Sequence, residues 1–188
     1  MTRRSLAGLV ALAVLALALG PRAQAQGGAA TAHDFAFADI DGGVLRLNQF
    51  AGRPMLVVNT ASMCAFTPQY DGLQALWTRY RDRGLVVIGV SSDSFNQELG
   101  DAQAVKDFCT ANYAVDFPMT EITEVTGPSA HPFYAWAARA PGSGGAPRWN
   151  FHKYLIDGQG RMVAGFGSGV GPNSPQLLRQ IEKLLPAA

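Results

Sequence analysis

The fold of this chain is decided by two apolar runs, Pro54-Met55-Leu56-Val57-Val58-Asn59-Thr60 and Leu85-Val86-Val87-Ile88-Gly89-Val90. Neither run alternates apolar with polar residues, and both contain β-branched residues, which is typical of strands buried on both faces of a sheet. Between them, apolar residues share one face of a predicted helix that ends at Gly84: Tyr70, Leu73, Leu76, Trp77 and Tyr80. A strand, a helix and a strand in this order form a βαβ unit, so we predict parallel strands.

Further elements extend this unit on both sides. One β-hairpin is predicted at residues 35–47 around Asp41-Gly42-Gly43, and another at 151–166 around Asp157-Gly158. Helices are predicted at 102–110, around 133–137 and at 177–185, with a short extended segment at 117–119. We therefore predict an α/β protein of thioredoxin-like layout, with a mixed central sheet flanked by helices and an N-terminal β-hairpin. The periodicity leaves the strand order open.

The first residues have the layout of a secretory signal peptide. Arg3 and Arg4 precede an apolar run at 6–19, and Ala23-Gln24-Ala25 forms a small-x-small cleavage site. We predict a signal peptide at 1–25, a linker at 26–32 and one domain at 33–188, in a periplasmic or secreted protein. Cleavage removes three arginines and no acidic residue, which changes the net charge from +1 to −2. The alternative is an uncleaved membrane anchor, although the run is short for a bilayer span.

Composition excludes several classes of function. The mature chain has no basic patch that would hold a nucleic acid. Its two cysteines, Cys64 and Cys109, form no CxxC pair, which excludes a dithiol motif of the thioredoxin type and a four-cysteine zinc site. The histidines His33, His131 and His152 match no metal-ligand spacing, and we interpret His131 as structural. In an exported chain, a static disulfide between the two cysteines is the starting alternative.

Cys64 lies four residues past the end of the first buried strand. Loops at the carboxyl ends of parallel strands are where α/β proteins place their ligands. The next helix is predicted to begin near Thr67 or Pro68, so the cysteine meets the free N–H groups and the positive end of that helix. Both favour a thiolate nucleophile. Position alone leaves open a second interpretation, a buried structural cysteine.

The sequence around Cys64 resembles the active-site loop of the glutathione peroxidase family, N-V-A-S-x-C-G-F-T-P-Q-Y. Matching residues are Asn59, Ala61, Ser62, Cys64, Phe66, Thr67, Pro68, Gln69 and Tyr70, while Thr60 and Ala65 differ. Further family blocks follow in order: F-C-x-x-N-Y-G-V-x-F-P-M at 108–119, A-H-P-x-Y at 130–134 and W-N-F at 149–151. The resemblance covers about residues 33–186.

This resemblance implies a peroxidase that reduces hydrogen peroxide or organic hydroperoxides and needs no cofactor. It implies that Cys64 is the peroxidatic residue, which attacks the O–O bond and becomes a sulfenic acid. It also implies that Trp149 and Asn150 belong to the catalytic tetrad, because their N–H groups can donate hydrogen bonds to the thiolate and the leaving oxygen. The alternative for Trp149 is plain packing in the core.

The fourth tetrad member of the family is a glutamine in the loop F-P-C-N-Q-F-G-G-Q-E-P-G, and this chain departs there. Its loop, residues 90–100, is one residue shorter, and Ser94 falls at the position of the catalytic glutamine. A serine hydroxyl reaches less far than a carboxamide, so we expect a weakened or rearranged donor at this corner. Gln97 corresponds to the second glutamine of the family loop. In the alternative interpretation, the shorter loop swings inward and Gln97 substitutes for the missing donor.

Cys109 occupies the place of the resolving cysteine in family members that use thioredoxin. The resemblance implies that it attacks the Cys64 sulfenic acid, giving a disulfide that a thioredoxin-like protein reduces, with glutathione as the other candidate reductant. The alternative is a buried helix cysteine without a redox role. Val105 and Phe108 indicate partial burial, so the helix has to unwind locally before the two sulfur atoms meet.

The short connection at 125–128 lacks the insertion through which tetrameric relatives assemble, which predicts a monomer with an open active site. An open site admits large lipid hydroperoxides. A second hypothesis for the function is a redox relay or sensor that passes oxidation from Cys64 to a protein partner.

Overall fold

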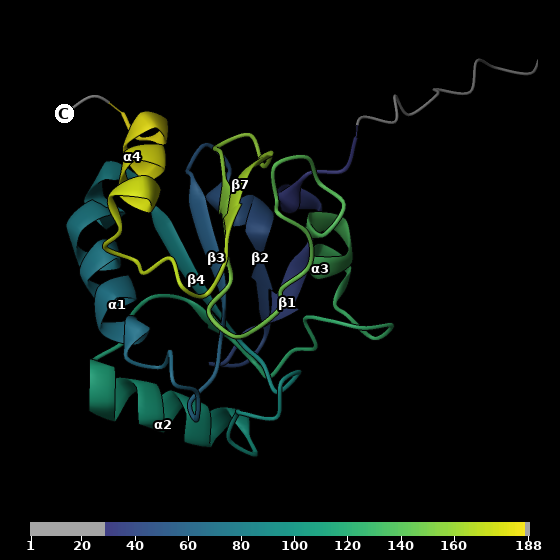
Figure 1. Cartoon of the computed structure of the whole chain (residues 1–188), viewed down its shortest axis with the longest axis vertical. Helices are drawn as coiled ribbons and strands as arrows, with labels where there is room; N and C mark the ends of the chain where they lie inside the picture. The colour runs from purple at the N-terminus through teal and green to yellow at the C-terminus, as the bar shows by residue number, and fades with distance from the viewer. Residues whose placement is uncertain (1–28, 187–188) are drawn as a thin grey trace, which may run out of the picture.

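The structure is a computed structural model that describes residues 29–186 (Figure 1). The predicted signal peptide, residues 1–25, and the first residues of the predicted linker lie outside the described part of the chain. Among the described residues, no helix is both long and apolar enough to cross a membrane.

A five-stranded mixed sheet forms the centre of the molecule, in the order β5-β4-β3-β6-β7. Its strands are β3 (Met55–Thr60), β4 (Val86–Ser91), β5 (Met119–Thr120), β6 (Lys153–Ile156) and β7 (Met162–Phe166). β3 pairs parallel with β4, as predicted for the βαβ unit, and antiparallel with β6. Every residue of β3 and β4 is buried, which confirms the prediction from the apolar runs. Because β6 runs opposite to β3, β6 begins close to the point where β3 ends.

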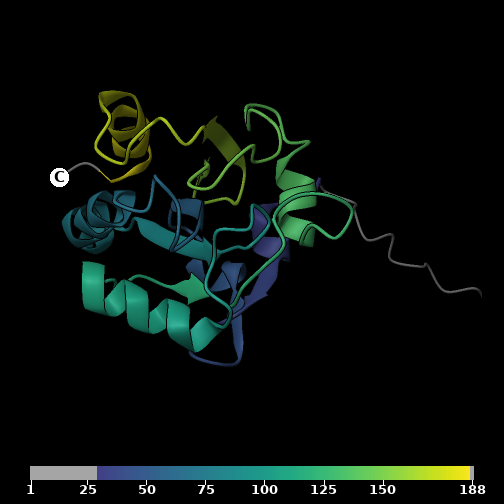
Figure 2. The same cartoon turned by 60° about the horizontal axis from the view of Figure 1, so that its bottom comes forward.

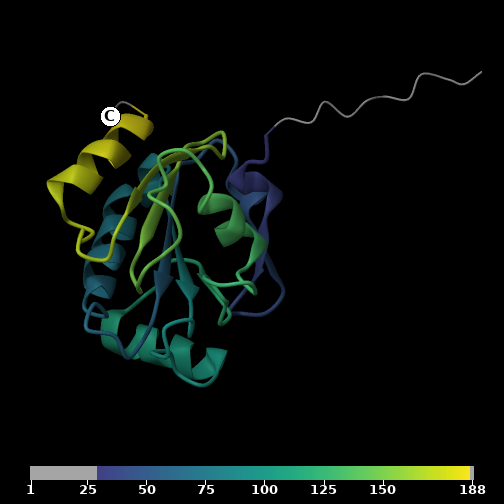
Figure 3. The ribbon, with the colours of Figure 1, turned by 45° about the vertical axis from the view of Figure 1, so that its right-hand side comes forward.

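Helices cover both faces of this sheet (Figures 1 and 3). On one face, α1 (Gln69–Tyr80), α2 (Ala102–Tyr113) and α4 (Pro175–Leu184) pack on a core that includes Leu56, Val87 and Leu155. Figure 2 brings α2 to the front, next to α1. On the other face, α3 (Pro132–Ala137) packs on a second core that includes Val57 and Ile88. Short 3-10 helices lie at Ala32–Asp34, Leu47–Phe50 and Arg81–Arg83. The thioredoxin-like layout is thus confirmed.

The N-terminal hairpin consists of β1 (Ala36–Ala38) and β2 (Val44–Arg46), which pair antiparallel as predicted. These strands form a separate small sheet on the face that α3 covers (Figure 3). The Ile40 N–H donates to the Met119 carbonyl (3.1 Å), and the Glu121 N–H donates to the Ala38 carbonyl (2.9 Å). The hairpin therefore covers the exposed edge at β5, where unpaired backbone groups would otherwise face solvent.

Several helix boundaries differ from the predictions, among them those of α4, which runs from Pro175 to Leu184 and not over 177–185. α1 begins at Gln69, slightly later than expected, and it continues through a 3-10 turn to Gly84, whose φ of 104° confirms it as the stop. α2 runs on to Tyr113 instead of ending near Thr110, and it closes at Ala114 in a left-handed conformation. Helix ends depend on capping contacts that the apolar pattern does not report.

Candidate active site

The candidate site lies where the loops after β3 and β4 meet, at the carboxyl ends of these parallel strands. The first loop carries Cys64, and the second carries Ser94 and Gln97. The two loops are joined directly, because the Met63 N–H donates to the Gln97 carbonyl over 2.9 Å. Loops in this position are held by the rigid sheet beneath them, which is how α/β proteins position reactive groups.

Cys64 sits in a tight turn ahead of α1 and not in the first turn of that helix. Its N–H donates to Thr67 Oγ1 (3.0 Å), and this hydroxyl donates to the Ala61 carbonyl (2.8 Å). The Phe66 N–H donates to Cys64 Sγ over 3.4 Å. The residue is only 7% exposed. The sulfur of this mostly buried residue therefore has a fixed backbone donor, and such a donor stabilises negative charge on a nucleophile.

Trp149 and Asn150 lie in a turn directly before β6. The Phe151 N–H donates to the Asn59 carbonyl at the end of β3 (2.6 Å), and Asn59 Nδ2 donates to the Trp149 carbonyl (3.2 Å). The turn is thus attached to the strand that leads to Cys64. Asn150 is fully buried, whereas Trp149 is 40% exposed and lies 5.3 Å from the Phe95 ring, measured between ring centroids. The alternative of Trp149 as a plain core residue is therefore wrong.

The loop after β4 presents Gln97, and not Ser94, to this turn. Gln97 Oε1 accepts a hydrogen bond from Asn150 Nδ2 over 3.1 Å. Ser94 Oγ instead donates to the Glu124 carboxylate (2.8 Å) and accepts from the Val125 N–H (2.9 Å). The expected correspondence, with Ser94 at the catalytic corner, is corrected by these contacts. The structure thus places the Gln97 side chain against Asn150, and that Gln97 supplies the missing donor stays a prediction.

Glu98, which was not predicted from the sequence as a site residue, also holds the Cys64 loop in place. Its carboxylate accepts from the Ser62 N–H (2.9 Å) and from Ser91 Oγ (2.7 Å). Ser91 is the last residue of β4, so the carboxylate joins the end of this strand to the loop that carries Cys64. An acidic residue in a loop after a buried parallel strand is the signal that marks such a position.

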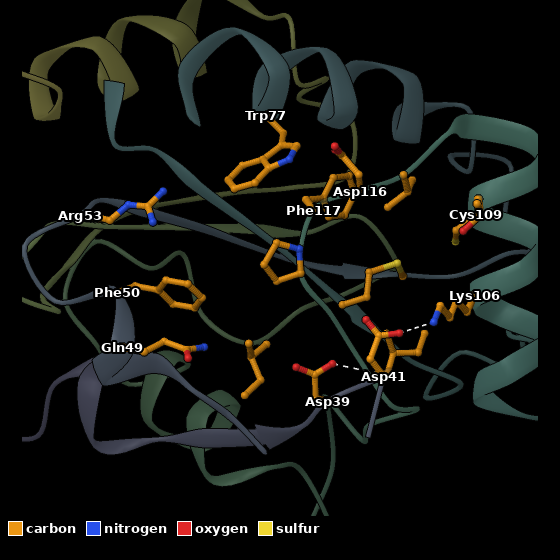
Figure 4. Close-up of a pocket in the computed structure, with 16 residues that line it drawn as sticks. Asp39, Asp41, Gln49, Phe50, Arg53, Trp77, Lys106, Cys109, Asp116 and Phe117 are labelled. Atoms are coloured by element: carbon orange, nitrogen blue, oxygen red, sulfur yellow. Dashed lines mark hydrogen bonds and ion pairs between the residues drawn. The ribbon is translucent and has the colours of Figure 1, made fainter. Parts of the chain in front are cut away.

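Cys109 is buried in α2, only 1% exposed, and both cysteines are free thiols. The static disulfide is therefore not the state of this structure. Burial, with a smaller contribution from the charge of Glu98, raises the pKa of the Cys109 thiol to about 11. Beside Cys109 lies a cavity of about 580 Å³ between α1, α2 and the segments leading out of β1 and into β5 (Figure 4). The Cys109 thiol is protonated at neutral pH and has to leave the core before it can react as a nucleophile.

The histidines form no metal site. Among residues 29–186, no group of three or more His, Cys, Asp or Glu side chains is placed to hold a metal ion. His131 caps α3, where its Nδ1 accepts from the Phe133 N–H (3.2 Å), and its ring stacks on Phe37 at 4.2 Å. Its predicted structural role therefore agrees with its contacts.

Comparison with solved structures gives the class of the protein. The crystal structure of Trgpx in its apo form matches with a TM-score of 0.66 and 29% identity over 84% of this chain and 96% of that chain. A thiol:disulfide interchange protein of the thioredoxin family from Chlorobium tepidum matches with a TM-score of 0.58 at 18% identity over 80% and 92% of the two chains. This second match concerns the fold alone. The class is that of thioredoxin-like proteins, with a single cysteine after the first central strand.

Comparison of sequences gives the family. The model of the glutathione peroxidase family matches residues 32–138. A hydroperoxy fatty acid reductase of Synechocystis is 44% identical over 82% of this chain and 96% of its own length. A glutathione peroxidase-like peroxiredoxin of Schizosaccharomyces pombe is 38% identical over 81% of this chain and 98% of its own length. This chain belongs to the glutathione peroxidase family and is a peroxidase of the glutathione peroxidase-like type.

Proposed function

We propose that this protein reduces hydrogen peroxide and organic hydroperoxides through Cys64. The observation that carries this proposal is the set of contacts around Gln97. Its carbonyl accepts from the Met63 N–H, next to Cys64, and its side chain accepts from Asn150 Nδ2. The Cys64 sulfur and its backbone donor thus lie at the same end of the sheet as Trp149 and Asn150. The side chains of these two residues carry further N–H groups. This arrangement suits a nucleophile whose reaction develops negative charge on oxygen.

In the first step, the Cys64 thiolate attacks one oxygen of the peroxide. An S–O bond forms and the O–O bond breaks, so the sulfur is oxidised to a sulfenic acid and the peroxide is reduced. The departing oxygen leaves as an alkoxide or hydroxide and takes up a proton to give an alcohol or water. N–H donors aimed at this oxygen lower the barrier because they are already oriented before the charge develops. Trp149 and Asn150 are the proposed donors, and Gln97 orients the Asn150 amide and contributes its own NH₂ group.

In the second step, Cys109 attacks the sulfenic sulfur of Cys64, an S–S bond forms and water leaves. A thioredoxin-like dithiol then reduces this disulfide by thiol–disulfide exchange. This step needs local unwinding of α2, because Cys109 is buried in that helix. Glutathione is the alternative reductant, which would attack the sulfenic acid directly.

The surface around Cys64 favours organic hydroperoxides among the substrates. Met63 is 67% exposed and Trp149 is 40% exposed, and both lie beside the candidate site. Phe66 and Phe95 are partly buried at the same place. An exposed apolar surface of this kind binds hydrocarbon chains. The name of the Synechocystis relative, a hydroperoxy fatty acid reductase, supports the same substrate class.

The signal-peptide pattern at 1–25 supports an exported, periplasmic or secreted, location, and the short 125–128 connection supports a monomer. In an oxidising compartment, the reductant must itself be an exported dithiol or thiol. The mass of the protein purified from culture medium or periplasm, and its elution volume, test these two parts of the proposal. A mass that retains residues 1–25, or a stable tetramer, would contradict them.

The function is tested by peroxide consumption under turnover with a thioredoxin system and with glutathione, in separate reactions. We expect turnover with thioredoxin, a low rate with glutathione, and none in either reaction for Cys64→Ser. Cys109→Ser should lose the thioredoxin-dependent rate and keep one oxidation per molecule. If the wild type forms a sulfenic acid but turns over with neither reductant, the peroxidase proposal fails in favour of the redox relay.

A further inference from the structure

The turn that carries Trp149 and Asn150 is held by three side chains from different parts of the chain. Each of its three successive carbonyl groups accepts a hydrogen bond from a side-chain donor: Trp149 O from Asn59 Nδ2 (3.2 Å), Asn150 O from Ser168 Oγ (2.6 Å) and Phe151 O from Lys153 Nζ (2.7 Å). The donors belong to β3, to the loop after β7 and to β6. The carbonyl groups of this turn therefore take their hydrogen-bond donors from side chains, whereas those of a helix or strand take them from backbone N–H groups.

The turn needs such support because its backbone is strained. Phe151 has a φ of 62°, in the left-handed region that residues with a Cβ atom rarely adopt. This conformation costs about 1–2 kcal/mol for a residue other than glycine, and it persists only where the surroundings impose it. The strained residue follows Asn150 directly, so relaxing its backbone would rotate the Asn150 amide away from Gln97.

Lys153 is the unusual member of the three donors. Its side chain is fully buried in a strand that is otherwise apolar or aromatic, and the Phe151 carbonyl is its single hydrogen-bond partner within residues 29–186. No carboxylate pairs with it in that part of the chain. Burial lowers its pKa from the usual value to about 7. A buried amine costs stability, and a methionine would fill the same space without that cost. Unlike methionine, a lysine at this position supplies a hydrogen-bond donor to the turn.

We propose that Lys153 is a positioning residue for the peroxidatic reaction, which holds the strained Phe151 carbonyl so that Trp149 and Asn150 face the peroxide. This inference rests on the function proposed above. Lys153 contacts neither Cys64 nor substrate in the proposal, and it acts through the geometry of the turn. It therefore affects the reaction of Cys64 with peroxide but not the reactivity of Cys64 toward reagents that need no such donors.

The test compares the wild type with Lys153→Met, which keeps the length and apolar stem of the side chain. We expect the rate constant for oxidation of Cys64 by hydrogen peroxide to fall about 10- to 100-fold, as for residues that orient a reacting group. The rate of Cys64 alkylation by iodoacetamide should stay within about twofold of the wild-type rate, because this reaction needs no donor from the turn. Asn150→Ala should also lower the peroxide rate, and the loss in the double variant should be smaller than the product of the two single losses, because both changes act on the same turn. Equal losses in peroxide and iodoacetamide rates would overturn the proposal.

A second readout does not depend on peroxidase activity. In protein labelled with ¹⁵N at its tryptophans, the indole resonance of Trp149 is identified by its loss in Trp149→Phe. We expect Lys153→Met to shift this resonance while those of Trp77 and Trp136 stay in place. An unchanged Trp149 resonance would overturn the positioning role, whether or not the wild type reduces peroxides. If Lys153→Met shifts the Trp149 resonance but the wild type does not reduce peroxides, then Lys153 positions the turn and the function proposed above is wrong.

Discussion

Gln97 is the residue that we propose compensates for the shortened loop of this chain. Its side chain is the acceptor for the buried Asn150 amide, while its backbone holds Met63 beside Cys64. We predict that Gln97→Ala lowers the rate of Cys64 oxidation by peroxide about 10- to 100-fold, since one positioned polar group in an active site is lost. The measurement is rapid-mixing kinetics of the reduced protein with hydrogen peroxide.

Ser94 supplies the matched control for this prediction. Its hydroxyl contacts Glu124 and Val125 on the outer side of the loop, so Ser94→Ala should change the rate less than about threefold. For the same reason, Ser94→Gln should bring no gain. A loss in Ser94→Ala as large as that in Gln97→Ala would contradict the assignment of the fourth donor to Gln97.

His152 gives the protein a predictable sensitivity to acid. The residue is 7% exposed, and burial, with a smaller contribution from the charge of Lys153, lowers its pKa to about 4. In the unfolded chain, a histidine has a pKa of about 6.5. Between these values the unfolded state binds a proton that the folded state does not bind. The free energy of unfolding therefore falls as the pH falls from about 6.5 to 4, by up to about 1.4 kcal/mol per pH unit.

We predict that His152→Phe reduces this dependence on pH. Urea denaturation at pH 6.5 and at pH 5 should show a loss of free energy of unfolding about 1.5 kcal/mol larger in the wild type than in the variant over this interval. Because the comparison concerns the slope with pH, a general loss of stability in the variant does not affect it. Equal losses in the two proteins would show that His152 is not buried in its neutral form.

At the residue scale, the motif around Cys64 and the Trp149-Asn150-Phe151 block indicated segments that the structure brings to one end of the sheet, and the roles of these residues stay predictions. The contact of the Gln97 side chain with Asn150 was not predictable, because it depends on the conformation of the shortened loop after β4. Lys153 was missed because the hairpin pattern at 151–166 does not report which side chains of its strands are buried. A single charged residue in an apolar strand is a signal of its own, since burying it costs free energy that the rest of the structure must offset.

At the element scale, hydrogen bonds at the C-terminal end of α2 reach back to the buried Cys109. The N–H groups of Ala114 and Val115 donate to the carbonyls of Thr110 (3.1 Å) and Cys109 (3.4 Å). These hydrogen bonds form the cap of the helix, and Ala114 adopts a φ of 49° to make it. A left-handed alanine costs about 1 kcal/mol relative to glycine. The last turn, which includes Cys109, is therefore closed by a strained cap, and the cavity of Figure 4 lies beside it.

We predict that Ala114→Gly stabilises this turn by about 1 kcal/mol and slows formation of the Cys64–Cys109 disulfide up to about fivefold, because local unwinding precedes it. The exposed Ala111, inside α2, gives the matched control: Ala111→Gly should weaken the helix and speed the step. Stopped-flow kinetics after oxidation of Cys64 measure both rates. Identical rates in the two variants would show that α2 need not unwind.

The elements themselves were largely predictable from the sequence, since the apolar runs of β3 and β4 and the one-face pattern of α1 are local signals. The C-terminal end of α2 was less predictable, because it depends on one left-handed alanine and its hydrogen bonds. Local pattern reports which residues are buried, whereas capping depends on the backbone conformation of a single residue.

At the scale of the whole molecule, the strand order creates the site. β6 runs antiparallel to β3, which places the Trp149-Asn150 turn at the end of β3 where the Cys64 loop begins. The parallel β4 brings the Gln97 loop to the same end of the sheet. Periodicity predicts the strands but not their neighbours, because pairing between distant segments depends on contacts that a local window does not contain. Family motifs, and not periodicity, indicated that these segments meet.

The central claim is that Cys64 is the residue that a peroxide oxidises first. The most direct measurement is peptide mass spectrometry of the reduced protein, quenched at short times after one equivalent of hydrogen peroxide, with a trap for sulfenic acid. We predict that a trapped sulfenic acid appears on Cys64 before any change at Cys109, and that it decays into a Cys64–Cys109 disulfide. In Cys109→Ser it should persist. An unmodified Cys64 with the peroxide unconsumed, or first oxidation at Cys109, would contradict the account.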